Sequence, residues 1–300
     1  MFPTTTHVSE FSAINPIAKC LDRALCSWLM HLVLGQVRKP IRELSKSLRD
    51  LPGNPPRRAV HNLRTRSRRL EAVAALLLLH DNQTARQLLK SIKALRKTAG
   101  LVRDMDVLEA KVRFLIRSSS YQPISCLSSF ERLLAHLQAI RAESARELVQ
   151  SFSADRKNLR RSLKSFSKCV EEEFTPQGID ARQAHAVFEE LCRWPRLCAQ
   201  NLHAFRIKIK ELRYMLQLME CANQALLNAL DRAKTRIGAW HDWEQLHRIA
   251  LEVLHPRRDR AAIAVIAHTE TTELKSAMHT AQSLRTRYLR TSNLLEIAEP

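Results

Sequence analysis

The chain has 300 residues, enough for one large domain or two ordinary ones, and 45% of them are hydrophobic while 26% are charged. That balance excludes wholesale disorder, and only five glycines argue against a β-sandwich or a doubly wound sheet. The 49 lysines and arginines outnumber the 30 aspartates and glutamates, giving a net charge of +19 that attracts anions such as nucleic acid, anionic lipid or polyphosphate.

The composition predicts an all-α fold, because Leu, Ala, Arg and Glu dominate and all four propagate helices well. Helical periodicity fills the stretches between the few prolines and glycines. In chain order we expect helices over 16–49, 57–80 and 84–117, with a candidate kink at Gly100, and helical sequence over 128–173, as one helix or two. After a turn at 175–178 the pattern predicts helices near 180–193, 197–221, 223–237, 240–254 and 257–291.

Two separated segments of the chain repeat in the same order. Residues 60–70 (VHNLRTRSRRL) align with 202–212 (LHAFRIKIKEL), and 100–108 (GLVRDMDVL) align with 238–246 (GAWHDWEQL). Two matches in one order are hard to produce by chance, so we interpret the chain as an internal duplication of one multi-helix unit. The predicted organisation is a flexible N-terminus, a first repeat, a second repeat and a C-terminal tail, over 1–14, 15–173, 180–291 and 292–300.

Both copies carry the pattern H-x-x-R-x-[RK]-x-[RK], which places a row of cations along one flank of a helix. At 100° per residue, the second-copy side chains fall within an arc of roughly 80°. Their neighbouring face is apolar and fits a core. Few acids stand beside either row, and aligned like charges repel, so a bound counter-anion is the simplest reason for this arrangement. The two rows are His61, Arg64 and Arg68 in the first copy, and His203, Arg206, Lys210 and Arg213 in the second.

The third helix of the first copy adds Lys93 and Lys97, with Arg96 beside them. In the second copy Lys234 stands opposite Arg96, but Asp231 stands opposite Lys93. The acidic residues nearby are expected to orient arginines or lysines rather than to act as catalytic acids. These are Asp104, Asp106, Asp242 and Glu244.

The stretches 60–70 and 95–108, with 202–213 and 238–246, resemble the CHAD family, the conserved histidine α-helical domain. The resemblance covers roughly residues 15–290. It implies two helical bundles related by a pseudo-twofold axis, with a basic central channel that binds inorganic polyphosphate. It further implies phosphate contacts from His61, Arg64, Arg68, His203, Arg206 and Lys210, with Arg69, Arg96, Lys97, Arg213 and Lys234 as neighbours, to which the lysine row adds Lys93.

The chain departs from this pattern at Glu211, which replaces an arginine by analogy with Arg69, and at Asp231. Both departures predict a weaker second half-site. A polyphosphate chain needs only cations and hydrogen-bond donors, which Arg, Lys and His supply. We therefore expect a binding protein with inorganic polyphosphate as its partner, not an enzyme, with no cofactor and no metal.

Nucleic acid is the main alternative ligand. Against it, no aromatic residue lies inside the basic rows as a stacking platform, and Trp240 and Trp243 are expected in the core. An enzyme would have to use metal-assisted phosphate chemistry, because the dispersed glycines exclude a P-loop. The side chains available for it are His61, His203, His241, Asp104 and Asp242.

The most apolar stretch, residues 25–37, is too short to cross a bilayer, so we expect no membrane insertion. A secretory leader has a basic segment followed by an apolar one, and the first residues of this chain show no such pattern. Seven cysteines without a C-x-x-C pair indicate reduced, buried thiols. Together these features predict a cytoplasmic protein, and the resemblance to the CHAD family implies an association with polyphosphate granules.

Overall fold

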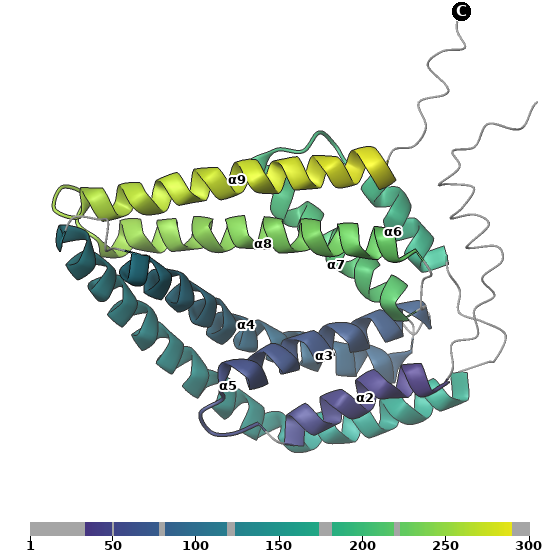
Figure 1. Ribbon diagram of the computed structural model, residues 1–300. Coiled ribbons are helices and arrows are strands. Elements are labelled where there is room, and N and C mark those ends of the chain that lie inside the picture. Colours follow the sequence, from purple (N-terminus) through teal and green to yellow (C-terminus); the bar gives the residue numbers. More distant parts are fainter. Residues whose placement is uncertain are drawn as a thin grey trace, which may run out of the picture.

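The computed structural model describes residues 34–49, 51–77, 82–118, 124–173, 182–218 and 223–289, and these contain eight helices and no strand (Figure 1). The predicted all-α fold is confirmed. The predicted termini 1–14 and 292–300, the expected start of the first helix at 16 and the turn at 175–178 lie outside the described residues. The helices are α2 (Leu34–Arg49), α3 (Arg57–Leu76), α4 (Gln83–Ser118), α5 (Ile124–Glu173), α6 (Arg182–Cys192), α7 (Ala199–Leu218), α8 (Gln224–Val253) and α9 (Arg260–Tyr288).

Three helices are continuous at places where the sequence pattern suggested a kink or a break. The helix α4 continues through Gly100 without interruption, α5 is one helix of 50 residues, and α8 spans the break expected between 237 and 240. A glycine inside a helix costs only about 1 kcal/mol relative to alanine. Burial outweighs that cost here, because Gly238 is buried and its neighbours Ile237 and Trp240 both belong to the core.

The chain forms two halves that meet at one end. The long pairs α4 with α5 and α8 with α9 converge on one side of Figure 1, while α2 and α3 cover the first pair and α6 and α7 join the second. Each half is built mainly around one hydrophobic core, but Ala72 and Ala75 of α3 pack into the core of the second half. A third core lies where the far ends of α4, α5, α8 and α9 meet, around Phe130, Leu108 and Trp243. The low exposure of Trp240 and Trp243, 2% and 5%, confirms that both pack into cores.

Three of the four cysteines that the structure describes are buried, as expected, and Cys198 is the exception. It precedes the first residue of α7, where its backbone N–H donates to Asn201 Oδ1 at 3.0 Å and its side chain lies outside the core. Burial raises the pKa of the Cys192 thiol to about 11. Within the described ranges, no helix has both the length and the apolar character needed to cross a membrane.

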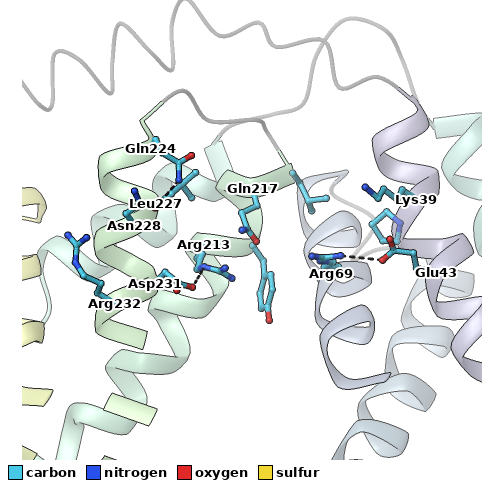
Figure 2. A pocket seen from close by; sticks show the side chains of 13 residues that line it. Lys39, Glu43, Arg69, Arg213, Gln217, Gln224, Leu227, Asn228, Asp231 and Arg232 are labelled. Carbon is cyan, nitrogen blue, oxygen red and sulfur yellow. Dashed lines mark hydrogen bonds and ion pairs between the residues drawn. The ribbon is translucent and has the colours of Figure 1, made fainter. Parts of the chain in front are cut away.

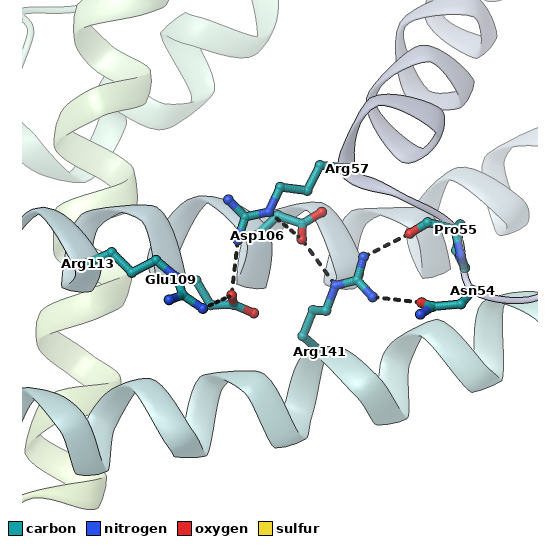
Figure 3. A network of polar contacts seen from close by, with 7 residues as sticks. All are labelled: Asn54, Pro55, Arg57, Asp106, Glu109, Arg113 and Arg141. Carbon is teal, nitrogen blue, oxygen red and sulfur yellow. Dashed lines mark hydrogen bonds and ion pairs between the residues drawn. The ribbon is translucent and has the colours of Figure 1, made fainter.

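A buried carboxylate network fixes the start of α3, the helix that carries the first basic row (Figure 3). Asp106 on α4 forms an ion pair with Arg57 Nε at 3.2 Å and accepts a hydrogen bond from Arg141 Nε at 3.1 Å. Arg141 also donates to Asn54 Oδ1 at 3.2 Å and to the carbonyl oxygen of Pro55 at 2.8 Å. The network therefore ties α4, α5 and the loop before α3 together.

Glu109, one turn after Asp106, adds a second buried carboxylate to this network and accepts from Arg57 Nη2 at 3.0 Å. The expectation that Asp106 orients nearby arginines agrees with these contacts. Two carboxylates that are each less than a tenth exposed hold one arginine at the beginning of α3.

Replacing Asp106 with alanine should lower the free energy of unfolding by about 3 kcal/mol, because Arg141, itself mostly buried, loses its carboxylate partner. The measurement is urea denaturation at neutral pH. Glu143→Ala is the matched control, since it removes the carboxylate of an exposed Glu143–Arg146 pair on α5 and should cost less than about 0.5 kcal/mol. Equal effects of the two substitutions would contradict a structural role for the buried network.

Candidate functional site

Helices α3, α4, α7 and α8 line a cleft of about 1100 Å³ between the two halves, which we call the basic cleft. Nine lysines and arginines line it against four carboxylates, so its walls carry a clear positive excess. The cations are Arg57, Arg64, Arg68, Arg96, Arg103, Lys111, Arg206, Lys210 and Lys234, and the acids are Asp104, Asp106, Asp242 and Glu273.

The structure brings together eight of the twelve residues that the sequence nominated: His61, Arg64, Arg68, Arg96, His203, Arg206, Lys210 and Lys234 line the basic cleft. Arg69 and Arg213 line a second cavity instead. Lys93 and Lys97 line neither and lie on the exposed face of α4. Arg96 is the member of this group that turns toward α3, where it pairs with Glu71.

Arg64 and Arg206, which the repeat aligns with each other, make the same unusual contact. Arg64 Nη1 donates to the main-chain carbonyl of Arg96 at 3.1 Å, and Arg206 Nε donates to that of Lys234 at 3.0 Å. Each arginine crosses a neighbouring helix over a glycine. A Cβ added at Gly100 would lie 2.5 Å from Arg64 Nη1, and one at Gly238 would lie 2.6 Å from Arg206 Nη2.

These crossings explain why glycine occurs in the interior of two continuous helices. No larger residue leaves room for a guanidinium against the helix backbone. Each arginine donates one N–H to a main-chain carbonyl. Its other N–H groups remain available to a ligand in the cleft that it lines. The aligned pairs Arg64 with Gly100 and Arg206 with Gly238 thus fix two guanidinium groups, one from each half.

Three cations at the centre of the basic cleft form no ion pair within the described residues: Arg64, Arg206 and Lys210, which we call the central cations. Burial lowers the pKa of both arginines. Burial also lowers the pKa of the Lys210 ammonium, and repulsion, first from Arg206 and then from Arg68, brings it to about 7. The lowered pKa of Lys210 therefore reflects its burial together with the four arginines around it.

The cations around this centre are paired with carboxylates. Glu71 contacts both Arg96 and, at 3.5 Å, Arg68. On the other side Lys234 Nζ lies 2.7 Å from Asp231. Of the two departures from the family pattern, Asp231 therefore touches the cleft through Lys234. The other, Glu211, pairs with Lys208 at 3.3 Å and does not line the cleft.

Arg103 lines the cleft but was not nominated from the sequence. Its Nη1 lies 3.1 Å from Asp104 Oδ1 and 3.2 Å from Asp242 Oδ1, so carboxylates from both halves hold it. Burial opposes its charge, but Asp242 and Asp104 outweigh burial and raise the pKa of Arg103. The expected orienting role of these two aspartates agrees with the contacts. The available signal was that Arg103 directly precedes the first of two aligned aspartates.

Lys111 was missed as well. It lies over the ring of Trp243, 4.3 Å from the ring centroid, and burial lowers the pKa of its ammonium. Its aromatic partner comes from the other half of the chain, so sequence spacing alone gives no signal of this contact.

The two aligned histidines have different surroundings. His203 contacts His241 with ring centroids 4.1 Å apart and ring planes tilted by 46°, whereas His61 is exposed. Both ring nitrogens of His241 have partners, Glu244 at 2.9 Å and Gln245 at 3.0 Å. Burial, followed by repulsion from His241, lowers the pKa of His203, so its imidazole is neutral at pH 7 and offers one N–H. Nowhere in the described ranges do three metal-ligating side chains gather.

Comparison with known proteins identifies the kind of domain that resembles this chain. The CHAD domain family model matches residues 35–251. PptA from Streptomyces chartreusis matches with a TM-score of 0.66 at 16% identity, over 85% of this chain and 98% of that one. The CHAD domain from the plant Ricinus communis matches with a TM-score of 0.53 at 18% identity, over 95% and 96%. No curated protein matches the sequence.

The glycine crossings predict a separation of stability from binding. In Gly100→Ala or Gly238→Ala the new methyl group displaces the end of a flexible arginine, while alanine favours the helix by up to about 1 kcal/mol. The melting temperature should stay or rise, and affinity for tripolyphosphate, a small probe anion, should fall about tenfold through the lost contact. Calorimetric titration and thermal melting measure the two quantities.

Gly53→Ala is the matched control for these variants, because no atom lies within 4 Å of a Cβ at that position. It should change neither the melting temperature nor the affinity for tripolyphosphate. Loss of stability with unchanged affinity in the other two variants would show that the glycines serve only packing.

Anion binding should be accompanied by proton uptake at Lys210. Its pKa is about 7 in the ligand-free cleft and rises beside a bound anion, so about half a proton is taken up at pH 7. The protonated form binds the anion better, so affinity should decline as pH rises through 7 toward the higher pKa of the complex. Titration in two buffers of different ionisation enthalpy measures the uptake.

Lys210→Gln serves as the reference for this measurement, because protons taken up by the anion or by histidines are common to both proteins. Proton uptake that is the same in wild type and variant would contradict the role given to Lys210.

Proposed function

This chain belongs to the CHAD domain family, whose model spans most of its length, and from that premise we propose that it binds inorganic polyphosphate in the basic cleft. The observation that carries the proposal is the set of central cations. Buried positive groups without a carboxylate partner destabilise a fold unless an anion joins them. Here Arg64 comes from one half and Arg206 and Lys210 come from the other, so one polyanion placed between the halves neutralises all three.

Polyphosphate suits this site because it presents charged oxygens along its whole length. The two guanidinium groups held over glycines supply forked donors, Lys210 supplies a point charge, and neutral His203 supplies one N–H. The duplication that the aligned segments predict gives a physical reason for the arrangement, since a polymer of identical units is met by two similar sets of donors. The matched Arg64 and Arg206 contacts favour that interpretation.

Nucleic acid is the second candidate ligand, and one observation favours it. The ring of Phe114 lies on the wall of the cleft and is 56% exposed. A stacking platform for successive bases needs several exposed rings, whereas Trp243 on the same wall is only 5% exposed and already lies beneath Lys111. These contacts favour polyphosphate over a nucleic acid strand.

We further propose that the protein holds the polymer without cleaving it. Asp104 and Asp242 both accept from Arg103, so their carboxylates hold a guanidinium in place and are poorly suited to act as a general base. A protein that binds but does not consume polyphosphate would collect where the polymer is stored. On this proposal its location is the cytoplasm, at polyphosphate granules.

The test compares two double variants, one from each half. Arg64→Ala with Arg68→Ala, and Arg206→Ala with Lys210→Ala, should each weaken long-chain polyphosphate binding more than a hundredfold, since each lost charge-assisted contact costs about 1.5–3 kcal/mol. The stoichiometry should not change, because both halves act on one ligand. Calorimetric titration returns affinity and stoichiometry separately. Half the sites at wild-type affinity would instead indicate two independent sites.

Two controls accompany this test. Lys93→Ala with Lys97→Ala removes the same number of charges outside the cleft and should have little effect at physiological salt. Competition at equal phosphate concentration should show polyphosphate displacing duplex DNA, and binding should weaken steeply with salt. Stronger binding of DNA, or phosphate release from polyphosphate above a blank, would overturn the proposal.

A further inference from the structure

Beside the basic cleft lies a second cavity of about 880 Å³, lined by α2, α3, α7 and α8 (Figure 2). Four cations line it, but only two carboxylates do. Amide side chains of Gln217, Gln224 and Asn228 add neutral hydrogen-bond donors. The cations are Lys39, Arg69, Arg213 and Arg232, and the acids are Glu43 and Asp231.

The second cavity is next to the basic cleft and shares a wall with it. Tyr214 on α7 lines both spaces. On α3, consecutive arginines divide between them, with Arg68 in the cleft and Arg69 in the second cavity. On α7, Lys210 lines the cleft and Arg213, one turn later, lines the second cavity. The basic rows of both helices therefore continue from one space into the other.

The two spaces differ in how their arginines are engaged. The central cations of the cleft form no ion pair with a carboxylate in the described chain. In the second cavity, by contrast, the arginines pair with carboxylates that line the same cavity. Arg69 Nη1 lies 3.2 Å from Glu43 Oε2, and Arg213 Nε lies 2.9 Å from Asp231 Oδ1 (Figure 2). Glu43 and Asp231 thus occupy the groups that an incoming phosphate would contact.

These ion pairs can be exchanged for phosphate at little cost. The side chains of Arg69 and Asp231 are 41% and 45% exposed, while their partners Glu43 and Arg213 are 25% and 19% exposed. Each pair thus has one member in contact with water, which limits its contribution to stability. When phosphate replaces the two carboxylates at Arg69 and Arg213, each carboxylate keeps another basic partner. Asp231 still has Lys234 at 2.7 Å, and Glu43 still has Arg66 at 3.9 Å.

We propose that the second cavity is a further phosphate-binding subsite, which takes the part of a polyphosphate chain that extends past Tyr214 and gives the protein a preference for long chains. A short chain is satisfied by the central cations and leaves the second cavity with its internal ion pairs. A long chain displaces Glu43 and Asp231 from Arg69 and Arg213. This inference rests on polyphosphate binding in the basic cleft.

The test measures affinity for tripolyphosphate and for long-chain polyphosphate in one set of variants. Arg69→Gln with Arg213→Gln should weaken long-chain binding about tenfold, a loss of about 1.4 kcal/mol, and leave tripolyphosphate binding within about twofold. Glu43→Gln should act in the opposite direction and strengthen long-chain binding about threefold, because it removes the competing carboxylate from Arg69. Thermal melting verifies that each variant is folded.

Lys93→Gln with Lys97→Gln is the matched control, since it removes two positive charges from an exposed face outside both cavities. It should affect both ligands alike and only slightly. If the Arg69 and Arg213 variant also affects both ligands alike, or neither, the second subsite is wrong.

The cleft variant Arg206→Ala with Lys210→Ala separates this inference from the function on which it rests. Loss of both ligands in that variant, with no selective effect at the second cavity, overturns only the subsite. Retention of both ligands in the cleft variant overturns the proposed function itself.

Discussion

Repulsion among the cations that face one another across the basic cleft is the constraint on which the rest of this structure depends. Arg64, Arg206 and Lys210 are partly withdrawn from water and form no ion pair within the described residues. Asp104 and Asp242 attract the two arginines from a distance, and burial with repulsion from Arg206 brings the pKa of Lys210 to about 7. A single hydrophobic core could enclose these charges only at a large cost in free energy. The molecule instead places these cations between two halves, which are joined through a third core at their far end and through the packing of α3 against α7.

Helix geometry holds the charged groups in place against this repulsion. The guanidiniums of Arg64 and Arg206 are fixed by main-chain carbonyls rather than by carboxylates, which positions them without cancelling their charge. Gly100 and Gly238 give them the necessary space. Where the chain does use carboxylates, Asp242 holds Arg103 and Asp106 holds Arg57 from another helix, which locks helices to one another. The same residue types therefore serve either binding or assembly, depending on whether an acid is within reach.

The arginines of the second cavity form ion pairs, in contrast to the central cations of the basic cleft, which form none in the described chain. Glu43 and Asp231 neutralise arginines that stand at the margin of the cleft, so positive charge is concentrated at its middle in the ligand-free protein. Asp231 stands where the repeat would place a lysine, and the sequence predicted a weaker second half-site for that reason. In the structure Asp231 contacts Lys234 and Arg213 at the margin and contacts none of the central cations, so the departure bears on the edge of the site.

The sequence by itself determined the helical class and the two basic helices with their aligned histidines, because periodicity and local charge are properties of one helix at a time. It therefore nominated Arg64, Arg68, Arg206 and Lys210, which the structure places on the walls of one cleft. Tertiary structure alone decided that Arg103 and Lys111 join them, since their partners Asp242 and Trp243 lie on another helix. It also turned Lys93 and Lys97 to the exposed face and carried α8 straight through Gly238. Those outcomes depend on which helix packs beside which, and burial against a neighbour outweighs the local preference of any single residue.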